Sequence, residues 1–497
     1  MDFFNSVDWS SLFSLSLILI IFFGVAVGVL IGSLPGLGAT IAIVLLLPIT
    51  YALTPIEAVI LLLSAYQGAE YGGSIASIIL GIPGTPAAVA TLLDGHPLSS
   101  KHSPGKALGY SLTSSLIGGL VGGLVLIFLS IPLAKIALKI SAPEFFLVGI
   151  IGLIAVAGLS SKNLVNGLIS AILGLMAGTV GMDMITGAQR YTFGNFELID
   201  GLSFVALLVG VFAVTEIFNM IQKDLQKKYD IRKNQLNAKI TLKEFKSILK
   251  PTSIGSAIGS IIGVLPGVGS ATACWFAYDG AKRASKKPEE FGKGNPEGIA
   301  APESANNAVV GSSLVPLLAL GIPGSGSMAV IMGAFIIHGV QPGPMVFSKD
   351  TELVHSILLA FLFTTVALFI VGKLLTPVFA SVLKVPNPIL IPIVFILAIL
   401  GAFASKDMYL DIWIALITGV VFYFLKKVDY SFPAFVLGFV LSPIIEENFR
   451  RSLIMSEGSY SIYFTRPYSI GLIIILLLFI SLIITNAMKK NKQTKTI

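Results

Sequence analysis

A short apolar motif interrupted by proline and glycine occurs twice in this chain, and it constrains the fold more than any other feature. The first copy covers residues 32–38 (GSLPGLG) and the second covers 263–269 (GVLPGVG). Each copy is followed by an Ile-Pro-Gly sequence, at residues 82–84 and 322–324. Proline lacks a backbone donor and clashes with the preceding helical turn, and glycine adopts backbone angles that other residues avoid. Each motif therefore predicts a helix that stops and restarts.

The composition places these interruptions in a membrane. Of the 497 residues, 55% are hydrophobic and 12% are charged, and the mean hydropathy is +0.90, whereas soluble domains carry roughly 25% charged residues. We expect an all-α polytopic membrane protein with about 11–12 segments of the ~20-residue length that spans a bilayer, some of them broken or re-entrant. In hydrocarbon, broken backbone persists only where it is buried in protein or lines a wet cavity. Matched breaks in two halves are typical of a transporter's substrate site.

The distribution of charge predicts the domain organisation. Basic residues gather in the segment 222–250 and at the carboxyl end, which is typical of cytoplasmic segments, and the acidic amino end is expected outside. We expect an N-terminal transmembrane repeat over 1–221, a basic cytoplasmic linker over 222–250, and a C-terminal repeat with an extra final helix over 251–497. Because the first repeat then crosses the membrane an odd number of times, the second is expected to be inverted. The basic residues of the cytoplasmic segments account for the net charge of +7. We therefore expect no nucleic-acid partner.

The helix that restarts after each break offers a site for a negatively charged ligand. A helix start has unpaired N–H groups and the positive end of the helix dipole, which together bind carboxylates and other anions. A single Pro-Gly kink is more often a packing feature, but four kinks in two matched pairs favour a binding site. The expected substrate-binding residues flank the breaks and include two neighbouring asparagines: Gly36, Leu37, Gly38, Thr40, Gly84, Thr85, Gly267, Val268, Gly269, Ser270, Thr272, Asn306, Asn307, Gly324 and Ser325.

Three carboxylates are candidates for carrying the coupling ion. Ionisable groups inside a membrane are functional hypotheses by default, and Glu70, Asp94 and Glu303 lie in or beside apolar segments. Asp94 begins an Asp-Gly-His-Pro sequence, which also predicts a structural turn. Glu303 follows Pro302, which is expected to open a helix, so the Glu303 carboxylate would equally suit the dipole of a first helical turn.

Several absences from the sequence narrow the function further. The single cysteine, Cys274, has no metal-ligand residues in a suitable pattern around it, and the four histidines show no metal-ligand spacing. The chain lacks a P-loop, a Gly-x-Ser-x-Gly sequence and a His-Glu-x-x-His sequence. We therefore expect no enzyme activity, no bound metal centre, and no cofactor other than a coupling Na⁺ or H⁺.

Longer motifs connect the chain to a known family. They are YGGSI at 71–75, GIPGTP at 81–86, DGHP at 94–97, AAPESANN at 300–307 and HGVQPGP at 338–344. Together with the two Leu-Pro-Gly-x-Gly breaks, they closely resemble the large permease subunit, TctA, of the tripartite tricarboxylate transporters over nearly the whole length. Two positions depart from this resemblance, because Gly81 and Gly280 stand where asparagine and glutamate are usual in the family.

The resemblance implies a multi-pass carrier in a prokaryotic plasma (inner) membrane, and the charges predict an external N-terminus and a cytoplasmic C-terminus. It implies import of a di- or tricarboxylate, or a related organic anion, with Na⁺ or H⁺ and without ATP. It also implies two partners, a small membrane subunit similar to TctB and an extracytoplasmic substrate-binding protein similar to TctC. Two alternatives remain open. One is an ion channel or exporter without a binding protein, and the other is a membrane-embedded transferase, which would need a nucleophile or metal cluster.

Overall fold

The computed structural model is built almost entirely from helices. It describes residues 2–34, 36–101, 103–159, 164–183, 185–222, 236, 238–382, 387–404 and 406–494. In this part of the chain, seven helices are long and apolar enough to cross a membrane, and six shorter helices are also apolar. This confirms the all-α polytopic membrane class, while the expected number of segments stays a prediction. Pro35 of the first motif and most of the linker, 223–235 and 237, lie outside the described residues.

The first half of the chain contains helices and one short β-hairpin. Their bounds are α1 (Asp2–Asn5), α2 (Trp9–Leu12), α3 (Leu15–Ser33), α4 (Gly38–Leu46), η1 (Leu47–Ala52), α5 (Pro55–Leu80), α6 (Ala88–Lys101), α7 (Pro104–Ala137), α8 (Ala142–Leu159), α9 (Leu164–Gly178), β1 (Gly181–Met182), β2 (Gln189–Arg190), η2 (Phe196–Leu198), α10 (Phe204–Leu208), η3 (Val209–Val214) and α11 (Thr215–Gln222). The sequence explains these starts locally. At α5, for example, Thr54 and Glu57 form a capping box, and Pro55 occupies the first turn.

The second half is helical throughout. Its bounds are α12 (Leu242–Val264), α13 (Gly269–Ala284), η5 (Pro288–Glu290), α14 (Glu297–Ser312), α15 (Leu314–Leu320), α16 (Gly326–Ile337), α17 (Val346–Lys349), α18 (Thr351–Val382), α19 (Asn387–Ala404), α20 (Tyr409–Lys427), α21 (Phe432–Met455), α22 (Ile462–Thr465) and α23 (Pro467–Thr494). Helix α12 begins inside the expected linker, because Thr241 and Glu244 form a capping box there. The division of the chain into two repeats and a linker stays a prediction.

Helices α5 and α14 form the centre of the molecule. Their side chains are buried on every face over residues 58–78 and 298–312, which is the pattern of a helix enclosed by other helices. Helices α7 and α18 both pack against α5, and α7 also packs against α14. The polar residues that these two central helices carry are therefore held inside the protein.

Glycines allow one helix in each half to approach the central helices closely. Gly24, Gly28 and Gly32 line the contact of α3 with α5, and Gly255, Gly259 and Gly263 line the contact of α12 with α14. A Cβ atom on Gly28 would lie 2.2 Å from the carbonyl oxygen of Ala65, and one on Gly259 would lie 2.4 Å from that of Ala305. Small residues four apart are typical of tightly packed membrane helices. Helices α3 and α12, which precede the two Leu-Pro-Gly-x-Gly breaks, therefore pack against α5 and α14 through the same glycine spacing.

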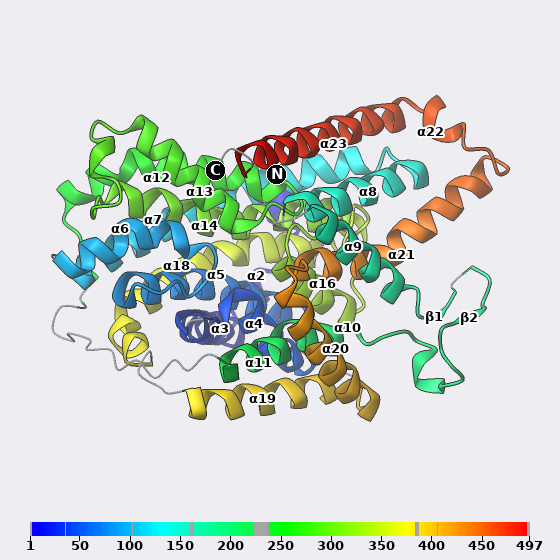
Figure 1. Cartoon of the computed structure of the whole chain (residues 1–497), viewed down its shortest axis with the longest axis horizontal. Helices are drawn as coiled ribbons and strands as arrows, with labels where there is room; N and C mark the ends of the chain where they lie inside the picture. The colour runs from blue at the N-terminus through cyan, green and yellow to red at the C-terminus, as the bar shows by residue number, and fades with distance from the viewer. Residues whose placement is uncertain are drawn as a thin grey trace.

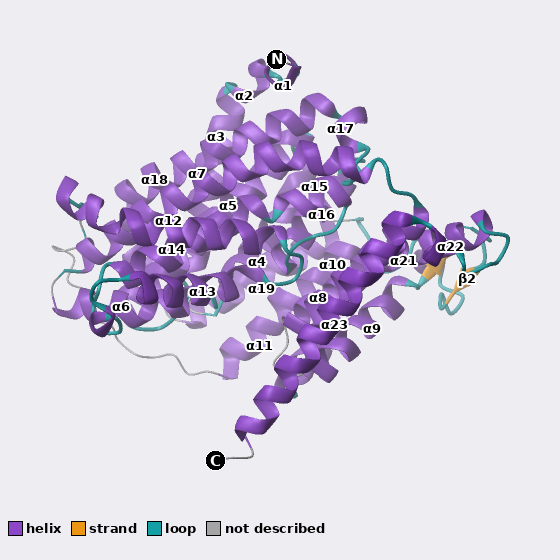
Figure 2. Ribbon diagram, turned by 90° about the horizontal axis from the view of Figure 1, so that it is seen from above, coloured by secondary structure: helices purple, strands orange, loops and turns teal. Residues whose placement is uncertain are grey.

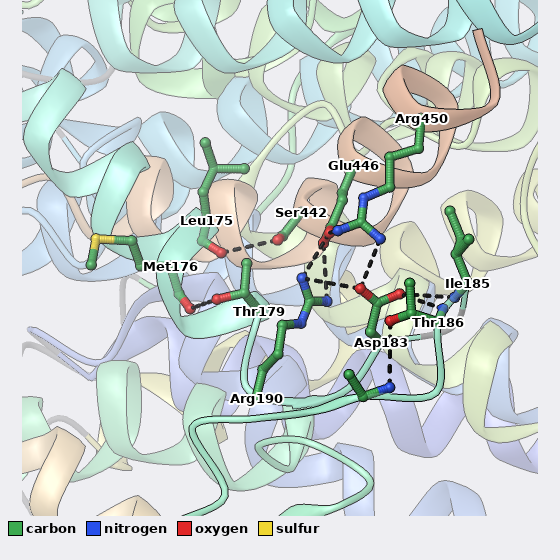
Figure 3. A network of polar contacts seen from close by, with 11 residues as sticks. Leu175, Met176, Thr179, Asp183, Ile185, Thr186, Arg190, Ser442, Glu446 and Arg450 are labelled. Atoms are coloured by element: carbon green, nitrogen blue, oxygen red, sulfur yellow. Dashed lines mark hydrogen bonds and ion pairs between the residues drawn. The ribbon is translucent and has the colours of Figure 1, made fainter. Parts of the chain in front are cut away.

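The hairpin of β1 and β2 lies at the opposite end of the molecule from α6 and α12 (Figures 1 and 2). Gly181 pairs with Arg190 across its two antiparallel strands. Four charged side chains join the hairpin to α21: Asp183, Arg190, Glu446 and Arg450, called here the Asp183 network (Figure 3). Arg190 donates to both oxygens of Glu446, at 2.7 and 3.2 Å, and Arg450 Nη1 lies 2.7 Å from Asp183 Oδ2.

Candidate functional site

One cavity of about 520 Å³ lies where the chain is interrupted. Residues from the starts of α4, α13 and α16, and from the segment that leads into α6, all line it. Nine of the expected substrate-binding residues are among its lining residues: Gly36, Leu37, Gly38, Thr40, Gly84, Thr85, Gly269, Ser270 and Ser325. The breaks of both halves, which are far apart in the sequence, therefore meet at a single place.

The Leu-Pro-Gly-x-Gly breaks have the same backbone geometry in both halves. Gly36 and Gly267 have φ angles of 97° and 85°, and Gly38 and Gly269 have φ angles of 66° and 73°. These angles lie in the left-handed region, which glycine adopts without the steric cost of a side chain. Helices α4 and α13 begin at Gly38 and Gly269 respectively. The paired glycines thus redirect the chain so that each new helix starts at the cavity.

The Ile-Pro-Gly breaks also match each other. Gly81 caps the C-terminus of α5 and Gly321 caps that of α15, with left-handed φ angles of 69° and 73°. Glycine and asparagine are the two residues that favour this capping position, so Gly81 suits it as well as the asparagine that the resemblance led us to expect. After these breaks, the hydroxyl oxygens of Thr85 and Ser325 accept hydrogen bonds from the amides of Ala88 and Met328.

Backbone hydrogen bonds already occupy three of the amides at the breaks. The N–H of Gly267 donates to the carbonyl of Gly324 at 2.8 Å, that of Leu37 donates to Leu34, and that of Gly84 donates to Gly73. The first turn of a helix also has N–H groups without intrahelical acceptors, and those of α4 and α13, whose caps make no side-chain hydrogen bond, remain for a ligand.

Charged side chains that the sequence did not single out also line the cavity. These are Lys426 and Glu216, which form an ion pair at 2.7 Å. Glu70, one of the expected ion-coupling residues, lines the cavity as well, and its Oε1 accepts a hydrogen bond from Ser270 at 3.2 Å. Glu216 projects from α11, just after the π-helical turn η3, where the Thr215 hydroxyl donates to the Gly210 carbonyl. Sequence analysis did not predict Lys426 as a cavity residue, because a lysine at the end of an apolar span is typical of a cytoplasmic loop.

Six expected substrate-binding residues are outside the cavity lining: Gly267, Val268, Thr272, Asn306, Asn307 and Gly324. Val268 is the N-terminal cap of α13, and Thr272 lies in the first turn of that helix. The Asn306 amide donates to the backbone carbonyl of Glu70 at 3.4 Å. Asn306 therefore lies directly behind a carboxylate that faces the cavity.

Glu303 lies in a cage of hydroxyl groups. It is buried and accepts hydrogen bonds from Ser74 at 2.5 Å, Ser111 at 2.7 Å, Ser115 at 3.3 Å, and Thr91. The expectation that Pro302 opens its helix is wrong, because α14 begins at Glu297. Asn295 Oδ1 accepts from the Glu297 amide at 2.9 Å and so satisfies a donor of that earlier start. Glu303 therefore lies in the interior of the helix sequence and its side chain is buried, whereas a place in the first turn was expected.

Asp94 lies inside α6, not in the expected turn at 94–97, because the helix continues through Pro97 to Lys101. The Asp94 carboxylate accepts hydrogen bonds from the Tyr278 hydroxyl at 2.8 Å and from the amides of Gly292, Gly294 and Asn295 at 2.8–3.0 Å. These contacts hold the loop that precedes α14. Asp94 is not among the residues that line the cavity.

A membrane protein that is almost entirely helical, and whose interrupted helices meet at one cavity, has the architecture of a membrane transporter. The chain belongs to the tripartite tricarboxylate transporter TctA family, whose model matches residues 18–437. It is 36% identical over 452 residues to the "Uncharacterized 52.8 kDa protein in TAR-I ttuC' 3'region" of Agrobacterium vitis, which covers 91% of this chain and 90% of the relative. It is 38% identical over 215 residues to the "Uncharacterized protein in TAR-II ttuC' 3'region" of the same organism, covering 43% of this chain and 89% of the relative. No solved structure matches the chain.

Proposed function

We propose that this chain is the large permease subunit of a binding-protein-dependent secondary transporter that imports a di- or tricarboxylate, or a related organic anion, with Na⁺ or H⁺. The observation that carries the proposal is the meeting of matched helix starts at one cavity of about 520 Å³. This volume lies within the ~300–1,000 Å³ that small-molecule sites occupy. The membership in the TctA family supports the same class of cargo.

The electrostatics of the cavity suit an anion with more than one negative charge. Each helix start contributes roughly +0.5 elementary charge, so the starts of α4, α13 and α16 together offer about +1.5 to carboxylate groups. Lys426 adds a cationic head group, which Glu216 holds in place and partly neutralises. The hydroxyls of Thr40 and Ser327, 2.9 Å apart, add neutral donors at the wall of the cavity.

The proposal includes the topology and the partners. Residues 1–221 and 251–497 form inverted repeats, the linker 222–250 and the C-terminus are cytoplasmic, and the N-terminus is outside a prokaryotic plasma membrane. The matched glycine angles and the matched glycine stripes of α3 and α12 support the repeat. An extracytoplasmic binding protein delivers the anion, and a small membrane subunit completes the complex, as the word tripartite in the family description suggests.

Reconstituted vesicles test this function. Vesicles with the three subunits are given labelled di- and tricarboxylates under separate Na⁺ and H⁺ gradients, with and without the binding protein. We expect saturable uptake that requires both the binding protein and one ion gradient. Uptake that never saturates, or that proceeds equally without the binding protein, would favour the channel or exporter and overturn the proposal. Chemical conversion of the labelled acid would favour the transferase.

Topology is tested separately with engineered cysteines. The native cysteine, Cys274, is buried, so a cysteine placed at Ser6 or at Thr494 would report labelling from one side only. We expect a membrane-impermeant maleimide to label the first from outside and the second only after the membrane is opened. The opposite pattern would invert the proposed orientation.

A further inference from the structure

A carboxylate of the chain already pairs with the lysine of the cavity. Among the described residues that line the cavity, the charged side chains are Glu70, Glu216 and Lys426. Lys426 Nζ lies 2.7 Å from Glu216 Oε2. Two carboxylates that meet at one cation repel each other. An anion that binds to Lys426 must therefore either tolerate Glu216 beside it or take its place.

Glu216 lies where the proposed function puts a carboxylate of the substrate. Its Oε1 atom faces Gly36, where an added Cβ would lie 3.0 Å from it. Gly36 belongs to the first break, and α4 begins at Gly38 without a side-chain cap. The Glu216 carboxylate thus has Lys426 beside one oxygen and the break that leads into α4 beside the other. A cation and a helix start are the two features that attract the carboxylate of a ligand.

The two members of the ion pair differ in exposure. The side chain of Lys426 is 45% exposed and that of Glu216 is 11% exposed, so an anion in the cavity can reach the lysine head group. On α11, the Asn219 amide donates to Glu216 Oε2 at 3.1 Å and to the carbonyl of Thr215 at 3.1 Å. Glu216 therefore keeps a hydrogen-bond donor when Lys426 turns to another carboxylate.

Other contacts hold α11 against α20. The Thr215 hydroxyl donates to the carbonyl of Gly419 at 3.2 Å. The Tyr423 hydroxyl donates to Gln222 Oε1 at 3.1 Å, and the rings of Tyr423 and Phe218 pack with their centroids 5.7 Å apart. A partly exposed ion pair adds little to such packing. The pair at the cavity is therefore not needed to join the two helices.

We infer that Glu216 is a tethered competitor of the transported anion: it occupies Lys426 in the empty cavity, and a carboxylate of the bound anion displaces it. When the anion leaves, Glu216 returns to Lys426. This inference rests on the proposed transport function and names the residue that sets the affinity of its site. Because binding exchanges one ion pair for another, the anion is held less tightly than a free lysine would hold it, and its release is faster.

The first experiment measures anion binding at equilibrium. The purified full-length chain in lipid nanodiscs is heated with increasing succinate, malate or citrate, at pH 7 in NaCl and at constant ionic strength. A ligand that binds the folded state raises the apparent Tm in a saturable way. We expect Glu216→Gln to lower the half-saturating concentration by about tenfold. An unchanged or higher concentration in this variant would overturn the inference, because Glu216 would then have no part in binding or would position Lys426 for the anion.

A double variant separates displacement from simple repulsion. Glu216→Gln also removes a negative charge that repels any anion. In a chain that carries Lys426→Met, no lysine is left to be freed, so we expect Glu216→Gln to change the half-saturating concentration there by less than about twofold. A gain of equal size with and without Lys426 would show repulsion alone and would overturn the inference.

Glu290→Gln is the matched control. Lys287 Nζ lies at the same distance, 2.7 Å, from Glu290 Oε1, and neither residue lines the cavity. This variant loses the same charge and should bind the three acids as the wild type does. A gain in Glu290→Gln equal to that in Glu216→Gln would overturn the inference, because the effect would then follow from net charge.

Glu216→Asp covers the case in which Glu216→Gln fails to fold. The aspartate side chain is one methylene shorter, so its carboxylate withdraws from Lys426 and Gly36 while the negative charge remains. We expect a smaller gain in affinity in the same direction. A folded Glu216→Asp variant that binds no better than the wild type would overturn the inference.

Uptake kinetics provide a measurement that a purely structural role would not reproduce. In vesicles, Glu216→Gln should lower both the KM and the maximal rate, because the anion binds more tightly and leaves more slowly. A raised KM, or a lower maximal rate at an unchanged KM, would overturn the inference. Binding by the wild type with no change in Glu216→Gln would refute the inference alone, whereas a failure of all three acids to bind to either chain would refute the proposed function with it.

Discussion

The Asp183 network and the hydroxyl cage around Glu303 hold carboxylates in opposite ways. In the network, two carboxylates meet two arginines, and Asp183 also accepts from the amides of Ile185 and Thr186 at 2.9 and 3.1 Å. In the cage, four neutral hydroxyls surround one carboxylate, and no described cationic side chain pairs with it. Opposite charges are paired within the network, whereas Glu303 has only neutral donors around it. We expect the first arrangement to serve structure, and the second is the environment of a residue expected to carry the coupling ion.

The largest expected effect is in the hydroxyl cage around Glu303. Glu303→Gln should lower the initial rate of uptake by about 100-fold, because it removes the buried charge of a residue expected to carry the coupling ion, and ionisable groups inside a membrane are functional by default. The measurement is vesicle uptake normalised to folded protein. Glu447→Gln is the control, since Glu447 forms a half-exposed pair with Arg451 on α21. Comparable losses in both variants would remove the contrast between the two regions.

The ion pair at the cavity is intermediate between these two arrangements. Lys426→Met should raise the KM for the anion about tenfold and change the maximal rate less, because the cationic head group belongs to the binding wall. The next residue offers a matched control. Lys427 lies over the rings of Tyr423 and Phe424 and does not line the cavity, so Lys427→Met should leave the KM unchanged. Equal KM values for the two variants would exclude Lys426 from the site.

Removing one arginine from the Asp183 network should affect stability and spare transport. Arg450→Ala leaves Asp183 and Glu446 with Arg190 alone, and the loss should be about 1–2 kcal/mol because the pair is partly exposed. Denaturation of the purified chain measures this change. Arg451→Ala, on the same helix, should cost less. A normal stability of Arg450→Ala, or a lost uptake in the folded variant, would show that the network has another role.

The smallest expected effect is the response of the hairpin to mild acid. The amides of Ile185 and Thr186, together with Arg450, hold the pKa of Asp183 below its ordinary value of 3.8. A carboxylate with a lowered pKa in the folded state contributes stability above its unfolded pKa and loses that contribution as the pH falls below it. The protection factors of the described amides in 181–183 and 185–190, which correct for the intrinsic pH dependence of hydrogen exchange, should therefore be unchanged between pH 7 and pH 5 and should fall only below about pH 4. Lower protection factors already at pH 6 would contradict this.

Sequence patterns were sufficient to predict where the helices are interrupted and that the chain is an all-α membrane protein. Proline and glycine act through the backbone, so their effect at Gly36, Gly81, Gly267 and Gly321 is local and could be predicted from the motif alone. The meeting of four breaks at one cavity followed from their matched occurrence in two halves. The assignment of these residues to substrate stays a prediction.

Long-range packing explains what the sequence missed. Lys426 resembles a loop lysine until α20 and α11 bring it to Glu216. Gln67 resembles an ordinary polar residue until α18 fixes its nitrogen and leaves its oxygen unpaired. The start of α14 at Glu297 and the inclusion of Asp94 in α6 depend on the loop at 291–295, whose amides Asp94 holds. None of these contacts could be predicted from the residues next to it in the sequence.

The π-helical turn η3 has one further consequence for the wall of the cavity. A π turn contains one residue more than an α turn, so every side chain after it is rotated by about 100° relative to an uninterrupted α-helix. Glu216 therefore faces Gly36, and an added Cβ on that glycine would lie 3.0 Å from Glu216 Oε1. Deletion of a single codon within 209–214 would restore the regular helix and turn Glu216 away from Lys426. The polarity of this wall thus depends on the length of one segment as much as on the identity of its residues.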